Sequence, residues 1–276
     1  MNKFDRICEQ IKKVKIQGAE NVAKAAIQVL AYRHDTRAIK KLISLRPTEP
    51  CLRNSLKFVL SHIDIKEGIQ DALEHFNFSK KKIAELGAKL IKNNSNVFTF
   101  CHSSTVVNIL RQAKRQGKRF QVIQTETRPL FQGRITAREL AKSKIKVTHV
   151  VDSAARVALK HSDIMLIGCD AISTTRIYNK IGSEMMAIVA NKYGVPVYVA
   201  TDSWKFDPET IYGIEKIEER APKEIWENAP KGVKIQNLAF EAIDPELVDG
   251  IVSELGIFMK KSFIAEVRRV YPWMFL

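Results

Sequence analysis

The stretch TETRPLFQGRITAREL, Thr125–Leu140, directly follows an apolar run at residues 120–123. Pro129 ends the strand that this run predicts, and Gly133 permits a turn before a polar segment typical of a helix. Open α/β sheets bind their ligands at such places, where a strand ends in a loop that leads into a helix. The planar guanidinium of Arg128 is therefore a candidate partner for a phosphate or a carboxylate.

The same strand-then-helix pattern repeats on both sides of this stretch. Short apolar runs predict strands at Val97–Cys101, Phe120–Gln124, Val147–Val151, Ile164–Gly168 and Val197–Ala200. The segments between them predict helices at Thr105–Arg115, Ala137–Ala141, Ser153–Lys160 and Ser183–Lys192. This alternation indicates a Rossmann-like α/β domain with a parallel sheet that is covered on both faces. A further helix is expected near the end of the chain, at Pro245–Leu255.

The first ninety or so residues differ from the rest, because apolar side chains recur there at helical spacing. Ile65–Phe76 and Lys81–Ile91 each predict a helix, and the polar run Asn93–Asn96 breaks the pattern. We therefore expect a small N-terminal helical domain at residues 1–94 and the Rossmann-like α/β domain at residues 95–276.

Composition narrows the class of protein. The chain has 276 residues, 45% of them hydrophobic, which is enough for a substantial core. No apolar run approaches the roughly 18 residues of a membrane span, and the first residues lack a signal peptide's apolar segment. The four cysteines show no metal-ligand spacing, so neither a zinc site nor a disulfide framework is expected, and a cytoplasmic location is predicted. Walker A, GxGxxG, GxSxG and HExxH motifs are absent, and no cofactor is predicted.

The formal net charge is +15, and the densest basic run is RQAKRQGKR, Arg111–Arg119. Helical spacing would place its five cations on one face. One interpretation is a contact with RNA or the ribosome. The other is a solvated helix face, which the lack of interleaved aromatic residues favours.

Polar side chains collect at the carboxyl ends of the predicted strands, which share one edge in a parallel sheet. They are Cys101, His102, Ser103, Glu126, Arg128, Asp152, Asp170, Asn179, Lys180, Asp202 and Lys205. Each has an ordinary explanation as well. Cys101 could be a buried small hydrophobe, Asp170 a helix cap and His102 a partner of the backbone. Arg128 and Lys180 could form structural ion pairs. Their coincidence on one edge favours a ligand site.

These residues resemble a known family. TETRPLFQGRITAREL is similar to a signature of the translation initiation factor 2B alpha/beta/delta family, and GCDAI with NKIGS is similar to a second one. FEAIDPELVDGIVSELG, Phe240–Gly256, resembles a third, and IQGAENVAKAAIQVLAYR resembles part of the family's helical domain. The family includes methylthioribose-1-phosphate isomerase and archaeal ribose-1,5-bisphosphate isomerase. The resemblance implies the two-domain fold and dimerisation through the α/β domain.

The resemblance also implies roles for single residues. Cys101 and Asp170 match the positions of the isomerases' two proton-handling groups. A thiolate in a basic pocket would have a lowered pKa. The phosphate or ligand contacts are expected at Gly18, Ala19, His102, Ser103, Arg128, Asn179, Lys180 and Lys205. Three features depart from the family's enzymes: Gln17 replaces an arginine, His102 replaces the usual asparagine, and the loop STTRIY between Ile172 and Asn179 lacks the family's asparagine-glycine turn.

Two functions follow, and the departures favour the first. The chain is expected to be a regulatory subunit of an archaeal initiation-factor-2B-like system. As such it would bind initiation factor 2, through its alpha subunit, and be linked to GDP/GTP exchange, with a retained pocket for a sugar phosphate or a nucleotide. The alternative is an aldose–ketose sugar-phosphate isomerase that uses Cys101 and Asp170. Whether the chain is an enzyme stays open at this point.

Overall fold

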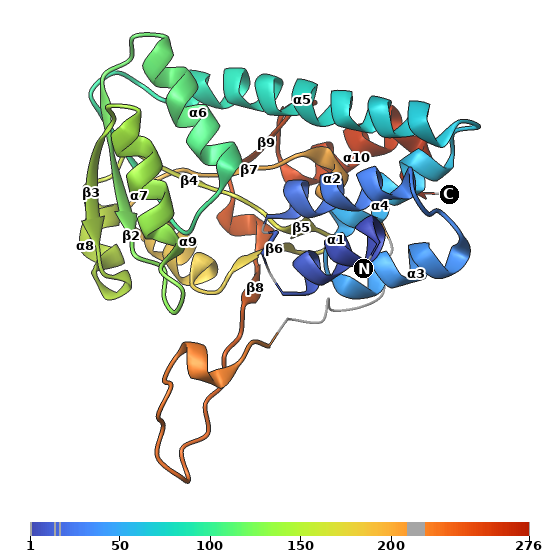
Figure 1. Cartoon of the computed structure of the whole chain (residues 1–276). Helices are drawn as coiled ribbons and strands as arrows, with labels where there is room; N and C mark the ends of the chain where they lie inside the picture. The colour runs from blue at the N-terminus through green and yellow to red at the C-terminus, as the bar shows by residue number, and fades with distance from the viewer. Residues whose placement is uncertain (1, 14, 17, 209–218, 276) are drawn as a thin grey trace.

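The computed structural model describes residues 2–13, 15–16, 18–208 and 219–275. Helices fill the chain up to residue 90, and strands alternate with helices after it (Figure 1). The helices are α1 Lys3–Lys12, α2 Ala19–Leu30, α3 Thr36–Leu45, α4 Pro50–Leu60, α5 Ile65–Leu90, α6 Ser104–Arg115, α7 Gln132–Lys142, α8 Ala155–Lys160, α9 Ser183–Lys192 and α10 Lys260–Val270. The Rossmann-like α/β fold with an N-terminal helical region is thus confirmed.

A seven-stranded sheet forms the centre of the second part. Its strands are β1 Ser95–Thr99, β2 Phe120–Thr125, β3 Lys146–Val150, β4 Ile164–Ile167, β7 Val197–Ala200, β9 Gly250–Ser253 and β10 Gly256–Phe258. The order is β10-β9-β7-β4-β1-β2-β3, and every pairing except β9 with β10 is parallel. The strand order therefore reverses between β1 and β4. Open sheets of this type bind ligands at that switch point.

A small antiparallel sheet lies beside the large one. It consists of β5 Ala171–Ile172, β6 Ile177–Lys180 and β8 Phe240–Ile243, in the order β5-β6-β8. The sequence pattern did not predict this sheet, because β5 has only two residues and the other two strands, IYNK and FEAI, do not form apolar runs. In Figure 1 the described segment 219–239 runs from this region away from the body of the molecule.

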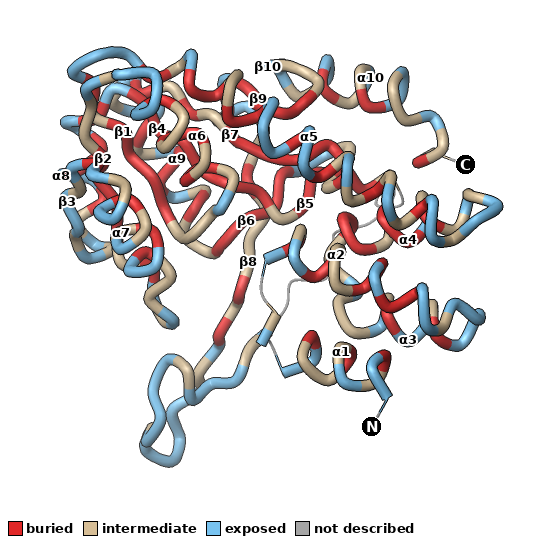
Figure 2. Tube along the Cα trace, turned by 45° about the horizontal axis from the view of Figure 1, so that its top comes forward, coloured by how far each residue is buried: buried red, intermediate tan, exposed pale blue. Residues whose placement is uncertain are grey.

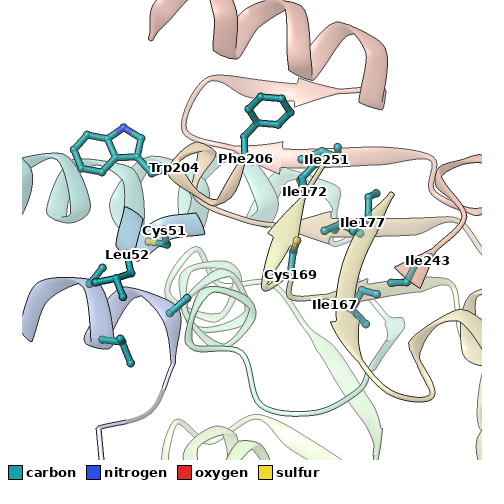
Figure 3. Close-up of a cluster of buried hydrophobic side chains, with 14 of the residues drawn as sticks. Cys51, Leu52, Ile167, Cys169, Ile172, Ile177, Trp204, Phe206, Ile243 and Ile251 are labelled. Atoms are coloured by element: carbon teal, nitrogen blue, oxygen red, sulfur yellow. The ribbon is translucent and has the colours of Figure 1, made fainter. Parts of the chain in front are cut away.

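Buried residues occur both in the helical region and in the large sheet (Figure 2), and their apolar side chains belong to one core cluster. Figure 3 shows one part of this core, where Cys51 and Leu52 of α4 lie near Trp204 and Cys169. Trp204 and Phe206, which follow β7, are almost fully buried. The helical region is therefore packed firmly against the loop that follows β7.

Three predicted elements are wrong. Residues 65–90 form a single helix: of the polar residues between the two predicted halves, Asn77 and Lys80 are exposed, and Ser79 is buried with a hydrogen bond to Asp202. Pro245–Leu255 is no helix: a short 3₁₀ turn is followed by the strand β9, whose four residues are all buried. The basic run Arg111–Arg119 is not one helical face, because α6 ends at Arg115 and Lys118 donates to the carbonyls of Ala88 and Ile91.

Candidate functional site

A cavity of about 370 Å³ lies at the carboxyl ends of β1 and β4, on the switch point of the sheet. The helical region closes it from the other side, through the N-terminus of α2 and the end of α3. Of the residues that the sequence predicted, Gly18, Ala19, Cys101, His102, Ser103, Asp170, Asn179, Lys180 and Lys205 line this cavity. Its volume is in the range typical of small-molecule sites.

Arg128 is the predicted site residue that the described structure does not bring to the cavity. Its side chain is exposed, its Nη2 donates to the carbonyl oxygen of Ile225 at 3.2 Å, and its guanidinium lies 5.0 Å from the centre of the Phe131 ring. The role expected for Arg128 as a ligand contact is therefore not supported by its position. It contacts the segment 219–239 instead.

The signature stretch Thr125–Leu140 fixes the backbone of Cys101 through two hydrogen bonds. The Cys101 N–H donates to Thr127 Oγ1 at 3.0 Å, and the Thr136 hydroxyl donates to the Cys101 carbonyl at 3.0 Å. Cys101 has a φ of 65°, a left-handed conformation that residues with a side chain rarely adopt. Two threonines of the signature thus fix a backbone conformation that would otherwise be unfavourable.

Asp152 in turn fixes the loop that supplies Thr127. Its two carboxylate oxygens accept from the backbone N–H groups of Thr127, at 2.8 Å, and Arg128, at 2.7 Å. Gly133 lets α7 begin directly against the end of β2, because a Cβ there would lie 1.9 Å from the Thr125 carbonyl oxygen. The expectation that Gly133 supplies a turn is corrected: it lies inside α7 and permits a close approach.

The Cys101 thiol has a raised pKa, which keeps it protonated near neutral pH. Burial raises its pKa to about 12, although the charge of Lys180 acts in the opposite direction. The lowered thiol pKa that the sequence suggested is therefore wrong, because loss of water outweighs the nearby cation. Unlike an ionised thiolate, this thiol starts as a proton donor.

Asp170 follows β4 and lines the same cavity as Cys101. Its backbone N–H donates to the Tyr178 carbonyl at 2.9 Å. Lys205 lies close to it. Burial lowers the pKa of Lys205, but the Asp170 carboxylate, with smaller help from Cys169, Cys51 and Asp202, raises that pKa by more. Lys205 Nζ also donates to the Cys169 carbonyl at 2.6 Å. Lys205 is therefore held in the cationic form beside the cavity.

Lys180 is a buried cation without a countercharge in contact. Its residue is 5% exposed, and among the described residues its ammonium makes no hydrogen bond or ion pair. The nearest described aromatic ring is that of Phe240, whose centre lies 5.8 Å away. A buried, unpaired charge is costly in free energy. A bound anion would remove that cost.

One interpretation gave His102 a backbone partner. Among the described residues, its ring instead contacts a side chain. Its Nδ1 lies 3.0 Å from the Thr136 hydroxyl, and burial lowers its pKa. Because that hydroxyl donates to the Cys101 carbonyl, it accepts from Nδ1–H of His102. Ser103 caps α6 through its hydroxyl, which accepts from the Val106 N–H. Asn179 Nδ2 donates to Ser183 Oγ at 2.9 Å.

Several lining residues were missed from the sequence. They are Glu20, Asn21, Arg46, Glu49, Gln132, Arg220 and Phe240. Arg46 lies at the end of α3 and Arg220 in the segment before β8, far from the strand ends in sequence. These residues do not directly follow the predicted strands, because the helical region and the segment before β8 close the cavity. Gln17, which carried part of the sequence argument, lies outside the described residues.

Comparison with known proteins places the chain among related sequences. Residues 10–260 match the model of the initiation factor 2 subunit family. The ribose 1,5-bisphosphate isomerase of Thermococcus kodakarensis is 35% identical over 97% of this chain and 94% of its own length. The enzyme of the same name from Pyrococcus furiosus is 33% identical over 98% of this chain and 94% of its own length.

Solved structures agree on the fold. The Pyrococcus horikoshii translation initiation factor eIF-2B superposes with a TM-score of 0.84 at 28% identity, covering 94% of this chain and 98% of that one. The 5-methylthioribose 1-phosphate isomerase of the same organism has a TM-score of 0.77 at 22% identity, which bears on the fold alone, and covers 97% and 88%.

The expected regulatory function is contradicted by these relatives. Six curated proteins that are 30–35% identical over 90–98% of this chain all bear the name ribose 1,5-bisphosphate isomerase. They favour the alternative, the sugar-phosphate isomerase. The preference for a regulatory subunit rested in part on the departures at residues 17 and 102. It did not take into account two further cations that line the cavity, Arg46 and Arg220.

Proposed function

The chain belongs to the initiation factor 2 subunit family, and we propose that it acts within this family as an aldose–ketose isomerase of ribose 1,5-bisphosphate. The observation that carries the proposal is the buried ammonium of Lys180, which lies in the same cavity as a protonated thiol and a carboxylate. The cation requires an anion, and the thiol and the carboxylate can exchange protons with a sugar.

Two helix N-termini support a ligand with two phosphates. Residues 18–21 at the start of α2 and residues 103–105 at the start of α6 both line the cavity. Helix N-termini carry unpaired N–H groups and a partial positive charge, which favour anions. Together with Lys180 and Lys205, they would provide positive potential on both sides of a bisphosphate.

The reaction needs one acid and one base at a time. The ring oxygen of the sugar must gain a proton as its bond to C1 breaks, and C2 must lose a proton to give an enol phosphate. In a second step C1 gains a proton and the hydroxyl on C2 loses one, which gives the ketose. Two groups that trade protons between the steps are therefore sufficient.

The resting protonation of Cys101 assigns the order. As a thiol it gives its proton to the ring oxygen while the Asp170 carboxylate takes the proton from C2. Asp170 then returns a proton to C1, and the Cys101 thiolate takes the proton of the C2 hydroxyl. Both groups end in the form in which they began, so no further reactant is needed.

The test is turnover of a small panel of sugar phosphates by the purified protein. We expect ribose 1,5-bisphosphate to be converted and ribose 5-phosphate, which lacks the phosphate on C1, to be a poor substrate. Methylthioribose 1-phosphate lacks the second phosphate and should react more slowly. Cys101→Ser and Asp170→Asn should each reduce kcat by about 10²-fold or more, the usual contribution of a positioned acid or base. Conversion by both variants at the wild-type rate would exclude the proposal.

A further inference from the structure

We propose that Glu254 is a positioning residue of this site: it holds the loop that carries Asp202 and Lys205 at the cavity, and its protonation state sets how tightly a bisphosphate binds. The inference rests on the proposed function for the identity of the ligand. Glu254 follows β9 and is 4% exposed. It lies behind the loop and is not among the described residues that line the cavity.

The contacts of Glu254 converge on Ser203, which lies between Asp202 and Lys205. The Ser203 N–H donates to Glu254 Oε2 at 3.1 Å, and the Ser203 hydroxyl donates to Glu254 Oε1. Two hydrogen bonds from one residue fix both its backbone and its side chain. Since Asp202 and Lys205 line the cavity on either side of Ser203, Glu254 determines where this part of the wall lies.

The rest of the loop is fixed by other buried groups. Asn54 of α4 donates to the carbonyls of Trp204 and Phe206, at 2.8 Å each. The ring of His75 stacks on Trp204, with centres 3.9 Å apart and planes 8° apart, and its Nε2 lies 3.2 Å from Asp202 Oδ1. Although burial lowers the pKa of His75, Asp202 raises it, so Glu254 and His75 are the two members of this network whose charge can change near neutral pH.

The hydroxyl of Ser79 lies between the two carboxylates. It donates to Asp202 Oδ2 and lies 3.2 Å from Glu254 Oε2. Because a hydroxyl has one hydrogen, it cannot serve both carboxylates fully, which favours a proton on one of them. One ring nitrogen of His75 and one carboxylate oxygen each of Asp202 and Glu254 all lie within 4.8 Å of one another. Two carboxylates this close favour sharing a proton.

The groups that face Glu254 agree with this assignment. They are Asp202 after β7, His75 and Ser79 on α5, Ser203 in the loop, and Tyr271 after α10, whose hydroxyl lies 3.5 Å from Glu254 Oε1. Burial, followed by the charge of Asp202, raises the pKa of Glu254 to about 7, while His75 acts in the opposite direction. Above that pH a second negative charge appears behind the cavity and opposes an anionic ligand.

The experiment measures the Kd of ribose 1,5-bisphosphate by calorimetry between about pH 6 and pH 8.5, across the range where Glu254 titrates. Glu254→Gln is compared with the wild type, and Glu241→Gln, which removes a less buried carboxylate on β8 outside the cavity, is the control. The phosphates of the ligand titrate with every variant, so the ratio of the variant and wild-type Kd removes their contribution. The ratio retains the response of His75, whose pKa burial lowers and the charges of Asp202 and Glu254 raise.

We expect the wild type to lose affinity relative to Glu254→Gln by about threefold or more as the pH rises through 7, from the added charge. Glu254→Ala should bind more weakly at every pH, and its Ser203 amide should exchange hydrogen faster. A ratio that does not change with pH, with unchanged exchange at residues 201–206, would overturn the inference. If the wild type binds no bisphosphate, the proposed function and the ligand part of the inference both fail, and amide exchange alone decides whether Glu254 holds the loop.

Discussion

At the scale of single residues, the account depends on the protonation of Cys101. Its pKa of about 12 means that the thiol stays protonated at every pH at which the protein is assayed. An acid with a raised pKa loses function only as the pH approaches that pKa. We therefore expect kcat/KM to be insensitive to thiol ionisation between about pH 7 and pH 10. A tenfold rise per pH unit over this range would instead identify the thiolate as the base.

Lys180 is the second residue whose role can be measured directly. Lys180→Met keeps the apolar length of the side chain and removes the charge. A hydrogen bond to a charged group contributes about 1.5–3 kcal/mol, so the Kd for ribose 1,5-bisphosphate should rise about 10- to 100-fold. Without ligand the variant should unfold at the same or a higher temperature, because an unpaired buried charge has been removed. Unchanged affinity would show that the ammonium does not contact a phosphate.

Sequence reasoning found most of these residues but not their chemistry. Cys101, Asp170, Lys180 and Lys205 were predicted from their places at strand ends, and they do line one cavity. The predicted direction of the shift in the Cys101 pKa was wrong, because the burial that raises this pKa is a property of the folded chain. Arg128 was also predicted from its place after a strand, but its side chain contacts the segment 219–239 instead.

At the scale of elements, the signature stretch acts as a support for the cavity wall. Thr127→Val preserves the shape of the side chain but removes the acceptor for the Cys101 N–H. Leaving a buried donor unsatisfied costs about 1–3 kcal/mol, so we expect lower stability in chemical denaturation together with reduced kcat.

Thr125 offers a matched control two residues away. Its hydroxyl is buried and, in the part of the chain that the structure describes, has no hydrogen-bond partner. Thr125→Val should therefore leave kcat unchanged and stability equal or higher. If the two valine variants behave alike, the contact between Thr127 and Cys101 does not position the thiol.

The elements also show where sequence patterns are insufficient. The parallel sheet follows from the alternation of strands and helices in the sequence, whereas the strand order and the switch point come from the structure alone. The helix predicted at Pro245–Leu255 is a strand because four buried residues in a row have no periodicity that separates the two. The small sheet was not predicted because β5 has two residues and because β6, IYNK, and β8, FEAI, include polar residues that break an apolar run.

At the scale of the whole molecule, the predicted homodimer stays a prediction. The helices α8 and α9 pack against each other, and Val157, Met185 and Ile188 on them are each more than half exposed. Exposed apolar side chains of this size favour contact with another protein surface. Analytical ultracentrifugation should give about twice the mass of 31.4 kDa. Met185→Asp with Ile188→Asp should shift the protein to the monomer, whereas a monomeric wild type would contradict the prediction.

Two further findings concern the molecule as a whole. In the described residues no helix is long and apolar enough to cross a membrane. An RNA contact of the basic run stays untested, but Arg111 pairs with Glu139 at 3.1 Å and Lys118 is used inside the fold, so fewer of its cations are available than the sequence implied.

The central claim, that this cavity isomerises a sugar bisphosphate, is tested most directly by following one carbon atom. Ribose 1,5-bisphosphate labelled with carbon-13 at C1 is incubated with the purified protein and observed by NMR. The account predicts that the C1 signal changes from a carbon with one hydrogen to a carbon with two, and that Cys101→Ser prevents this change. A C1 signal that persists with the wild-type protein, while calorimetry shows the sugar bound, would contradict it.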